Sequence, residues 1–308
     1  MPNAIPLLEG TDASGGYLVR DSYGQTLLDT INRESAVMSL ARVDRVPGKR
    51  QKYSVYAGRP TAAFVSEGAA KGTTGAEFSE LTVNVKKIAT NILYTEELLE
   101  DAAEDPRVLI NADVEAAFAD LIDAHAIGKA AGTNLTTSFD NSLRQTTSTV
   151  ELGSGGDAIA KAISDAMNVV EGNGGVPSGI ILATDGKAQL RNARHSGDNA
   201  AMPVYTDGFN REPDSLYGLP LSYSTNLSTF ATAAGANKIV GIVGDFSHAV
   251  GVMRSDLTVR ASDQATVDVG GTLHHLWQQN KVALQWEMRV GFTIHDRNRM
   301  FVAIVDAS

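Results

Sequence analysis

The chain contains no cysteine and few aromatic residues: none of its 308 residues is Cys, and Phe, Trp and Tyr make up 6%. The lack of thiols excludes disulfides, Fe–S clusters, thiolate zinc sites and cysteine catalysis. No apolar run approaches the roughly 18 residues of a membrane helix, and residues 1–16 lack the basic start and apolar core of a signal peptide. We therefore expect a globular protein, without a membrane partner, that is made in the cytosol and stays there or in something assembled there.

Positive charge is also scarce, since 26 basic residues face 36 acidic ones and the net charge is −10. Binding to free nucleic acid needs clustered Lys and Arg, so this balance leaves only weak, non-specific contact with enclosed DNA open. A hydrophobic content of 43% is enough for one large domain or two medium ones. The 29 glycines indicate a turn-rich chain.

A polar, glycine-rich segment runs from Val43 to Glu80 and is interrupted by Pro47 and Pro60. It has too few apolar residues to build a core of its own. A long segment of this kind in a compact protein is usually functional. A hairpin arm that packs on a neighbouring molecule would account for its isolated apolar residues, which are Phe64, Val65 and Phe78.

On either side of this segment the pattern predicts regular structure. Residues 23–42 predict one or two short helices, with Ser35 as a helix N-cap, behind an extended N-terminal arm. Residues 81–93 alternate like a strand, with a bulge near Lys86. Pro106 starts a long helix that ends at Gly128. Its apolar stripe is Ile110, Val114, Phe118, Leu121, Ile122 and His125, and the residues off the stripe are Asp113, Glu115, Asp120 and Asp123.

The second half of the chain predicts an α/β module. After a connection at residues 133–156, an amphipathic helix follows over residues 159–170, and Ile180–Leu182 is a buried strand. Asp185 is expected to cap a short helix that ends at Arg194. Further strands are expected over 238–243, 250–259 and, as a pair, 281–305.

Few clusters of residues in the sequence could form a catalytic, cofactor-binding or metal-binding site. Asp245, Ser247 and His248 have the residue types of a catalytic triad, but neighbours on a strand cannot align one. His274 and His275 point in different directions, which disfavours a metal site. The remaining cluster is better explained by helix capping than by cation binding; it comprises Glu96, Glu97, Glu100, Asp101, Glu104 and Asp105. We therefore predict no catalytic, cofactor-binding or metal-binding residue, no cofactor and no enzyme activity.

The order of several short motifs resembles the major capsid proteins of tailed phages, which share the shell fold named after phage Hong Kong 97. Residues 64–68 (FVSEG), with Phe78 and the strand at 81–93, look like the family's extended hairpin loop. Residues 95–101 (TEELLED) are similar to the segment leading into its spine helix, here Arg107 to Ala130. Three further matches follow: 217–220 (YGLP) resembles a Gly-x-Pro turn, 243–246 (VGDF) a Gly-Asp-Phe strand end, and 287–292 (EMRVGF) a closing Arg-x-Gly strand.

This resemblance implies an α+β, Hong Kong 97-like capsid fold with five parts. These are an N-terminal arm with short helices (1–44), an extended hairpin loop (45–80), a peripheral domain with the spine helix (81–150), an inserted axial domain (151–262) and return strands to the peripheral domain (263–308). It also implies hexamers and pentamers in an icosahedral head that encloses double-stranded DNA, with a portal and, in some relatives, a decoration protein. Some relatives carry an N-terminal scaffolding region that is later cleaved, and this chain has no room for one before Tyr17. Either a separate scaffolding protein acts or the chain is already processed, and Met1 favours the former.

Three alternatives stay open at this stage. One is a shell subunit of an encapsulin-like compartment, and another is an α/β enzyme whose lid is the segment 43–80. The third is a decoration or tail protein, although these are usually smaller or lack a long helix followed by an α/β insertion. Some capsid relatives also form Lys–Asn crosslinks beside a glutamate. Lys71 and Glu67 lie in the loop, but Asn280 and Asn298 match no motif, so we assign no crosslink.

Overall fold

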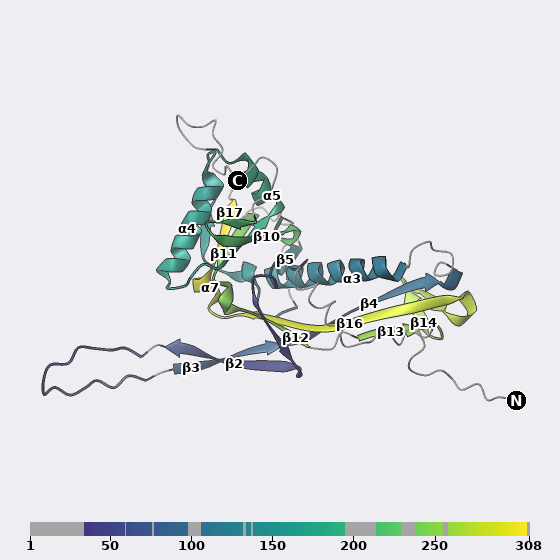
Figure 1. The fold of residues 1–308 in the computed structure, drawn as a ribbon, viewed down its shortest axis with the longest axis horizontal. Helices are drawn as coiled ribbons and strands as arrows, with labels where there is room; N and C mark the ends of the chain where they lie inside the picture. The colour runs from purple at the N-terminus through teal and green to yellow at the C-terminus, as the bar shows by residue number, and fades with distance from the viewer. Residues whose placement is uncertain are drawn as a thin grey trace.

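The computed structural model describes residues 34–58, 60–75, 77–97, 106–131, 134–136, 138–194, 214–228, 238–254 and 258–306. Two β-sheets form the body of the molecule (Figure 1). One lies in an elongated lobe beside a long helix, and the other lies in a lobe that rises from one end of the first. A two-stranded hairpin projects from the body away from both lobes.

The elongated lobe is built on β16 (Lys281–Ile294), a strand of 14 residues. One edge of β16 pairs with β4 (Lys86–Thr95), and the other pairs with β12 (Ala249–Arg254) and β13 (Thr258–Ser262). β1 (Arg42–Val46) adds in parallel to β12. Alternate residues of β16 are buried, as a half-exposed sheet requires; they include Trp286, Met288, Val290 and Phe292.

The long helix α3 (Pro106–Asp123) continues as a π-helical turn, η3 (Ala124–Gly128). Val114, Phe118 and Ile122 are buried against the sheet, which confirms the four-residue spacing of the predicted stripe. The helix ends at Gly128, whose φ of 88° is readily available only to glycine. A small hairpin, β5 (Lys129–Ala131) and β6 (Asn134–Thr136), follows.

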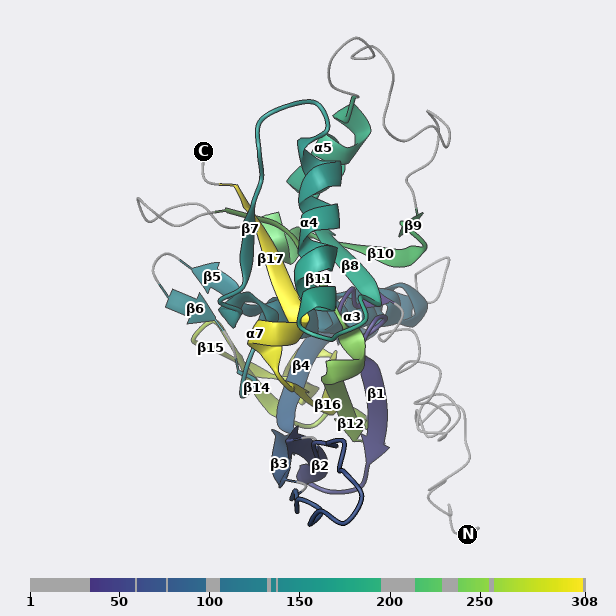
Figure 2. The same ribbon diagram turned by 90° about the vertical axis from the view of Figure 1, so that its left-hand side faces the viewer.

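The second lobe contains a six-stranded sheet in the order β7-β17-β11-β8-β10-β9. Helix α4 (Ala158–Gly172) lies across one face of this sheet, as Figure 2 shows, and buries Ile159, Ile163 and Val170 there. The strands are β7 (Thr149–Glu151), β8 (Gly179–Ala183), β9 (Ser215–Leu216), β10 (Leu219–Ser224), β11 (Lys238–Gly244) and β17 (Phe301–Asp306). The shorter helices are α5 (Thr184–Asn192), α6 (Thr225–Ser228) and α7 (Arg297–Met300).

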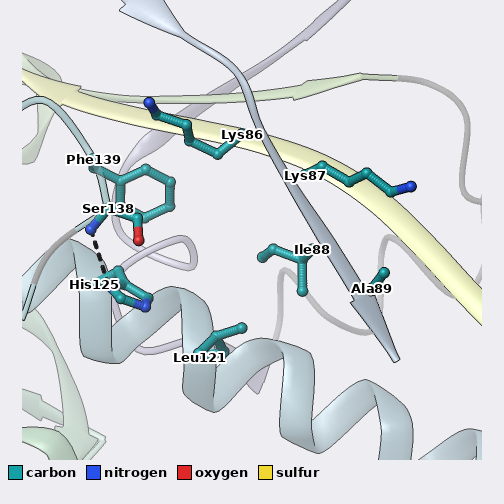
Figure 3. A pocket seen from close by; sticks show the side chains of 8 residues that line it. All are labelled: Lys86, Lys87, Ile88, Ala89, Leu121, His125, Ser138 and Phe139. Carbon is teal, nitrogen blue, oxygen red and sulfur yellow. Dashed lines mark hydrogen bonds between the residues drawn. The ribbon is translucent and has the colours of Figure 1, made fainter. Parts of the chain in front are cut away.

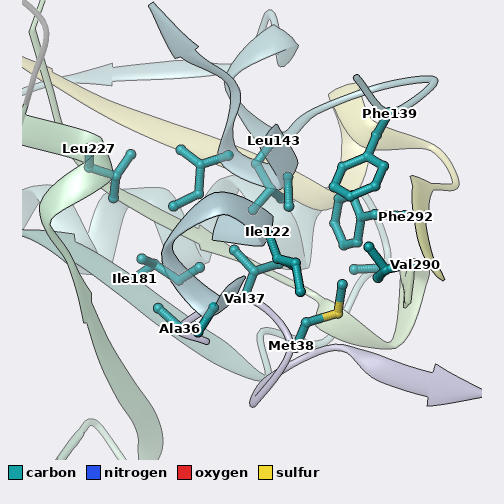
Figure 4. Close-up of a cluster of buried hydrophobic side chains, with 14 of the residues drawn as sticks. Ala36, Val37, Met38, Ile122, Phe139, Leu143, Ile181, Leu227, Val290 and Phe292 are labelled. Carbon is teal, nitrogen blue, oxygen red and sulfur yellow. The ribbon is translucent and has the colours of Figure 1, made fainter. Parts of the chain in front are cut away.

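One hydrophobic cluster joins the two lobes. Ile181 and Leu227 from the second lobe pack in the same cluster as Ile122 of α3 and Phe292 of β16 (Figure 4). Val37, just before β1, also lies in it. Because interiors are close-packed, this shared core makes the described body one unit despite its two sheets.

The projecting hairpin is formed by β2 (Arg50–Gly58) and β3 (Glu77–Asn84), with residues 60–75 as its loop. This observation confirms a hairpin in the segment predicted to contain one. A second, smaller hairpin, β14 (Thr266–Val269) and β15 (Thr272–His275), lies near the far end of the elongated lobe (Figure 1).

Strand pairing differs from the predicted division of the chain. The inserted lobe was expected to extend to Ser262, but β12 and β13 pair with β16 in the five-stranded sheet. Residues 263–308 were expected to return to the first lobe, but β17 lies between β7 and β11 in the six-stranded sheet. The sequence of an apolar strand does not indicate which of the two sheets it joins. The predicted end of the inserted lobe and the predicted course of the last strand are therefore both wrong.

Two predicted strands are also divided in the structure. The strand expected over 81–93 is two strands: β3 pairs with β2, β4 pairs with β16, and the change of partner falls at Val85. The strand expected over 250–259 is interrupted between β12 and β13. The predicted N-terminal arm and first short helix lie largely outside the described residues.

Two predicted helix caps were assigned wrong roles. Ser35 caps a short turn, and no second helix follows: its Oγ accepts the Met38 N–H at 3.0 Å. Asp185 lies in the first turn of α5 without capping it and forms an ion pair with Lys238.

Candidate assembly surfaces

The hairpin arm, defined as β2, β3 and their loop, carries polar contacts both between its strands and along β3. Lys52 Nζ lies 2.8 Å from Glu80 Oε1, and Thr82 Oγ1 donates to the same oxygen at 2.9 Å. The hydrogen bonds from Lys52 and Thr82 hold the pKa of Glu80 below its usual value. The arm is therefore ordered by its own pairing, although it encloses no core.

Aromatic side chains of the arm are left in solvent. Tyr56 and Phe78 face each other across the strands with ring centroids 4.6 Å apart, yet they are 61% and 62% exposed. Phe64 in the loop is fully exposed, and Val65 beside it is 42% exposed. Exposed apolar groups that gather on one projecting element are typical of a protein–protein contact.

The base of the arm is fixed to the body. Tyr53 Oη donates to Asp44 Oδ2 at 2.7 Å, and the Arg42 guanidinium lies 5.9 Å from the Tyr53 ring centroid. Burial, reinforced by the hydrogen bond to Asp44, raises the pKa of Tyr53 to about 12. A Cβ on Gly291 of β16 would lie 2.8 Å from the Asn84 carbonyl oxygen, so the arm crosses close to the sheet there.

A second apolar surface lies on the β14–β15 hairpin and the 3-10 turn that follows it, η7 (Trp277–Gln279). Val269, Leu273 and Trp277 are exposed there, Trp277 by 73%. The turn between the strands contains Gly270 and Gly271, both with positive φ. This surface and the arm lie toward opposite ends of the molecule (Figure 1).

Asp245, Ser247 and His248, which have the residue types of a catalytic triad, form a turn. Asp245 Oδ1 accepts from the Ser247 backbone N–H at 3.1 Å and from Ser247 Oγ at 2.6 Å, as a capping aspartate does. His248 Nε2 lies 3.9 Å from the other Asp245 oxygen, and its ring stacks on His295 with centroids 5.7 Å apart. Because Ser247 donates to the aspartate, His248 does not activate it as a base would.

The other candidates are scattered over the surface. Nδ1 of His274 lies 2.9 Å from Gln279 Oε1, and Nδ1 of His275 lies 3.0 Å from Thr266 Oγ1. Glu96 and Glu97 follow β4, and the rest of that acidic cluster lies outside the described residues. Within the described ranges, no three His, Asp or Glu side chains come together as a metal site would require.

Lys71 and Glu67 are exposed in the hairpin loop. Asn280 occupies a left-handed position with φ of 46°, and the Asn298 side chain accepts the Thr147 N–H at 3.1 Å. The backbone conformation of Asn280 and the hydrogen bond of Asn298 thus both belong to the fold of the chain itself.

One residue whose role the sequence pattern does not predict is Asp123, which lies off the apolar stripe of the long helix. Its side chain is 4% exposed and accepts from Ser35 Oγ at 2.6 Å, the Ala36 N–H at 2.8 Å and the Val37 N–H at 3.1 Å. Burial raises the pKa of Asp123 to about 6, against the lowering effect of these hydrogen bonds. Asp123 thus joins the last turn of α3 to the segment before β1.

Comparison with known proteins decides the family. The family model described as "Phage capsid family" matches residues 15–304. The chain belongs to the phage capsid family. Among curated proteins it is 27% identical over 297 residues to the "Probable major capsid protein gp17" of Mycobacterium phage L5, with 92% of this chain and 87% of that protein covered. It is 24% identical over 312 residues to the "Major capsid protein" of Staphylococcus phage 80alpha, covering 99% and 89%.

Solved structures support the fold. A chain from Mycobacterium phage Bobi matches with a TM-score of 0.71 at 21% identity, covering 98% of this chain and all of that one. A chain from Microbacterium phage Oxtober96 matches with a TM-score of 0.70 at 23% identity, covering 88% and 91%. The "Capsid of native GTA particle computed with C5 symmetry" matches with a TM-score of 0.66 at 18% identity, covering 100% and 95%.

The phage capsid protein therefore has the α+β, Hong Kong 97-like fold and acts as a structural subunit, which excludes the enzyme with a mobile lid. Its family identifies it as a tailed-phage major capsid protein and a virion component, built into a shell of many copies. Among the described residues, no helix is both long and apolar enough to cross a membrane.

Proposed function

We propose that this capsid protein assembles as hexamers and pentamers of an icosahedral head that encloses double-stranded DNA. The observation that carries the proposal is the hairpin arm, which is ordered at its base and exposes Tyr56, Phe64 and Phe78. A second copy that covers these rings would gain burial that the single chain cannot provide. The GTA capsid chain, solved with C5 symmetry, supports a fivefold ring.

The arm and the β14–β15 surface are different patches near opposite ends of the subunit. Contacts between unlike patches are heterologous, and they close into rings when the rotation between copies allows it. This geometry favours capsomer rings over an isologous dimer. The division of the chain into an arm, a hairpin and two lobes is part of the same proposal, with the lobe boundaries set by the strand pairing.

The further partners we propose are a separate scaffolding protein, a portal and a possible decoration protein. Contact with DNA is proposed to be weak and non-specific because the net charge of −10 opposes tight phosphate binding. Assembly is proposed to take place in the cytoplasm of the bacterial host.

Electron microscopy and size-exclusion chromatography of the purified chain, alone and with a co-expressed scaffolding protein, test this proposal. Closed shells or rings of five and six subunits are the expected result. A monomer or dimer under every condition would contradict it. Nucleic-acid content separates the phage head from the compartment alternative: particles purified from an infection should contain double-stranded DNA, whereas an encapsulin-like shell would contain protein cargo.

A further inference from the structure

Two segments that carry the chain between the lobes lie against each other. Asp245 and η6 (Phe246–His248) lead from β11 of the six-stranded sheet to β12 of the five-stranded sheet. Residues 295–300, which include α7, lead back from β16 to β17. The His295 N–H donates to the His248 carbonyl oxygen at 2.9 Å, so the two crossings are bonded to each other. Figure 1 shows α7 at the foot of the second lobe, beside the end of β16.

A histidine from each crossing meets its counterpart at this joint. The rings of His248 and His295 are nearly parallel, at 13°, with centroids 5.7 Å apart. Each ring also has a carboxylate of its own crossing beside it. Nε2 of His248 lies 3.9 Å from Asp245 Oδ2, and Nε2 of His295 lies 3.3 Å from Asp296 Oδ2. The two histidine side chains are 29% and 20% exposed, so solvent protons reach both rings.

Protonation of the rings acts differently within a crossing and between the crossings. Histidine is the side chain whose ordinary pKa lies within the physiological range. A protonated ring is attracted to the carboxylate of its own segment. Two protonated rings repel each other across the stack, and the stack is the side-chain contact that joins the segments. Acid therefore favours each crossing by itself and weakens the contact between them.

Further charged side chains lie on the segments packed around the pair. They are Arg42 of β1, Asp140 and Arg144 of the segment before β7, and Arg297 and Arg299 of α7. Arg297 donates to Gln145 Oε1 at 2.9 Å, and Arg299 donates to the carbonyl oxygen of the residue that ends α4 at 3.0 Å. Arg42 and Asp140 bond to polar side chains of β1 and β3, and burial lowers the pKa of Arg144. Among the described residues, the carboxylates in contact with the two rings are Asp245 and Asp296.

His125, which is also partly buried, is held differently. Figure 3 shows it lining a hollow of about 520 Å³ between β4 and α3, where its Nδ1 accepts the Ser138 N–H at 3.0 Å. Burial lowers the pKa of His125, which favours the neutral ring. His125 therefore does not share the role of the stacked pair.

We propose that the stacked pair of His248 and His295 is a pH-sensitive latch between the two crossings. The latch is closed when at most one ring is protonated, and it opens when both are. Opening is local, because the hydrophobic cluster that both lobes share stays packed. It frees the two segments that set how the second lobe stands on the elongated lobe. The inference does not depend on the proposed assembly, because both rings and both carboxylates belong to one subunit.

Amide hydrogen exchange of the purified full-length subunit tests the latch. The His295 N–H donates to the His248 carbonyl oxygen and the Asp245 N–H donates to that of Met300, so both amides report on the joint. Exchange in peptides covering 245–249 and 294–300 is measured at pH 7.5 and pH 5.5, relative to the unfolded chain at the same pH. We expect protection in both peptides to fall roughly tenfold at pH 5.5, between the limits that bulk water and a protein surface set for two unit charges at this separation. Protection in α4 should not change.

Substitution of either ring should remove this effect. His248→Gln and His295→Gln each leave one ring to be charged, so each should keep its protection at pH 5.5, and the double variant should match either single one. His275→Gln, which changes an exposed histidine on the β14–β15 hairpin, is the matched control and should behave like wild type. Equal protection of wild type at both pH values, or the same loss in the His248 and His295 variants, would overturn the latch and leave the capsid role intact.

Salt gives a second readout that needs no variant. The Debye length is about 10 Å at 0.1 M salt and about 3 Å at 1 M, so high salt should restore part of the protection that wild type loses at pH 5.5. A loss of the same size at both salt concentrations would contradict repulsion between the rings as its cause.

Discussion

Replacing Asp123 by asparagine tests whether burial or hydrogen bonding has the larger effect on the pKa of this carboxyl group, which joins α3 to the segment before β1. The carboxylate accepts three hydrogen bonds, which favour its charged form, but it is buried, which favours its neutral form. The pKa of about 6, against an ordinary 3.8, means that burial outweighs the hydrogen bonds. The exposed carboxylate of Asp120, one turn earlier, adds to the rise.

The sign and size of the pH effect follow from that pKa. Because it is raised in the folded state, the folded subunit binds more protons than the unfolded chain between about pH 4 and 6. The stability that Asp123 contributes is therefore fully present below pH 3.8 and is lost as the pH rises through about 6. A difference of about 2 pH units corresponds to about 3 kcal/mol. The Asp123→Asn variant cannot ionise and lacks this dependence.

We expect the free energy of unfolding of wild type, minus that of Asp123→Asn, to fall by about 2.5 kcal/mol between pH 4 and pH 7.5, because pH 4 already lies just above the ordinary pKa of 3.8. Urea unfolding of the unassembled subunit, followed by the fluorescence of the buried Trp286, measures this difference. Asp113→Asn, an exposed carboxylate on the same helix, is the control and should differ from wild type by no more than about 0.5 kcal/mol at any pH. A difference that is flat or rises with pH would show that the three hydrogen bonds outweigh burial and would refute the reasoning.

Three further substitutions test the packing and the arm. Gly244→Ala should destabilise the subunit by about 1–3 kcal/mol in urea unfolding, because its Cβ would meet the Met300 carbonyl oxygen at 2.7 Å. Ile181→Ala should cost about 2–5 kcal/mol by the same assay, since Ile181 is fully buried, whereas Val169→Ala on the exposed side of α4 should cost less than about 1 kcal/mol. Phe78→Ala should cost the subunit no more than about 1.5 kcal/mol but sharply lower the particle yield seen by electron microscopy; an unchanged yield would contradict a role in assembly.

The elements predicted well from the sequence are those whose pattern is local. Ile159, Ile163 and Val170 repeat at helical spacing, and α4 buries all three. Ile180–Leu182 is a short apolar run after a glycine-rich helix end, and β8 is fully buried. Periodicity alone does not specify how these elements are arranged. The overall fold was predicted from the order of motifs that resembles phage capsid proteins.

The predictions failed where the position of a strand or side chain depends on a pairing or hydrogen-bond partner that is distant in the sequence. β17 is a continuous apolar run whose first five residues are all buried, and nothing in its residues says that it pairs with β11 instead of β16. At Val85 the chain leaves the arm for the sheet, and the pattern on both sides stays strand-like. Asp123 looked solvent-facing because its hydrogen-bond partners are some 87 residues away in the chain.

The exposed apolar surfaces also could not be predicted from residue type alone. Phe246 and Phe301 pack edge to face in the core with centroids 5.2 Å apart, while Tyr56 and Phe78 form a closer pair, at 4.6 Å, in solvent. Aromatic residue type does not distinguish the two pairs. The polar residues around the second pair do, because they supply no core to cover it. Strand pairing and contacts at its base already order the arm, so exposing the rings is not needed to fold the subunit. We therefore expect a partner chain to cover these rings when the subunit assembles.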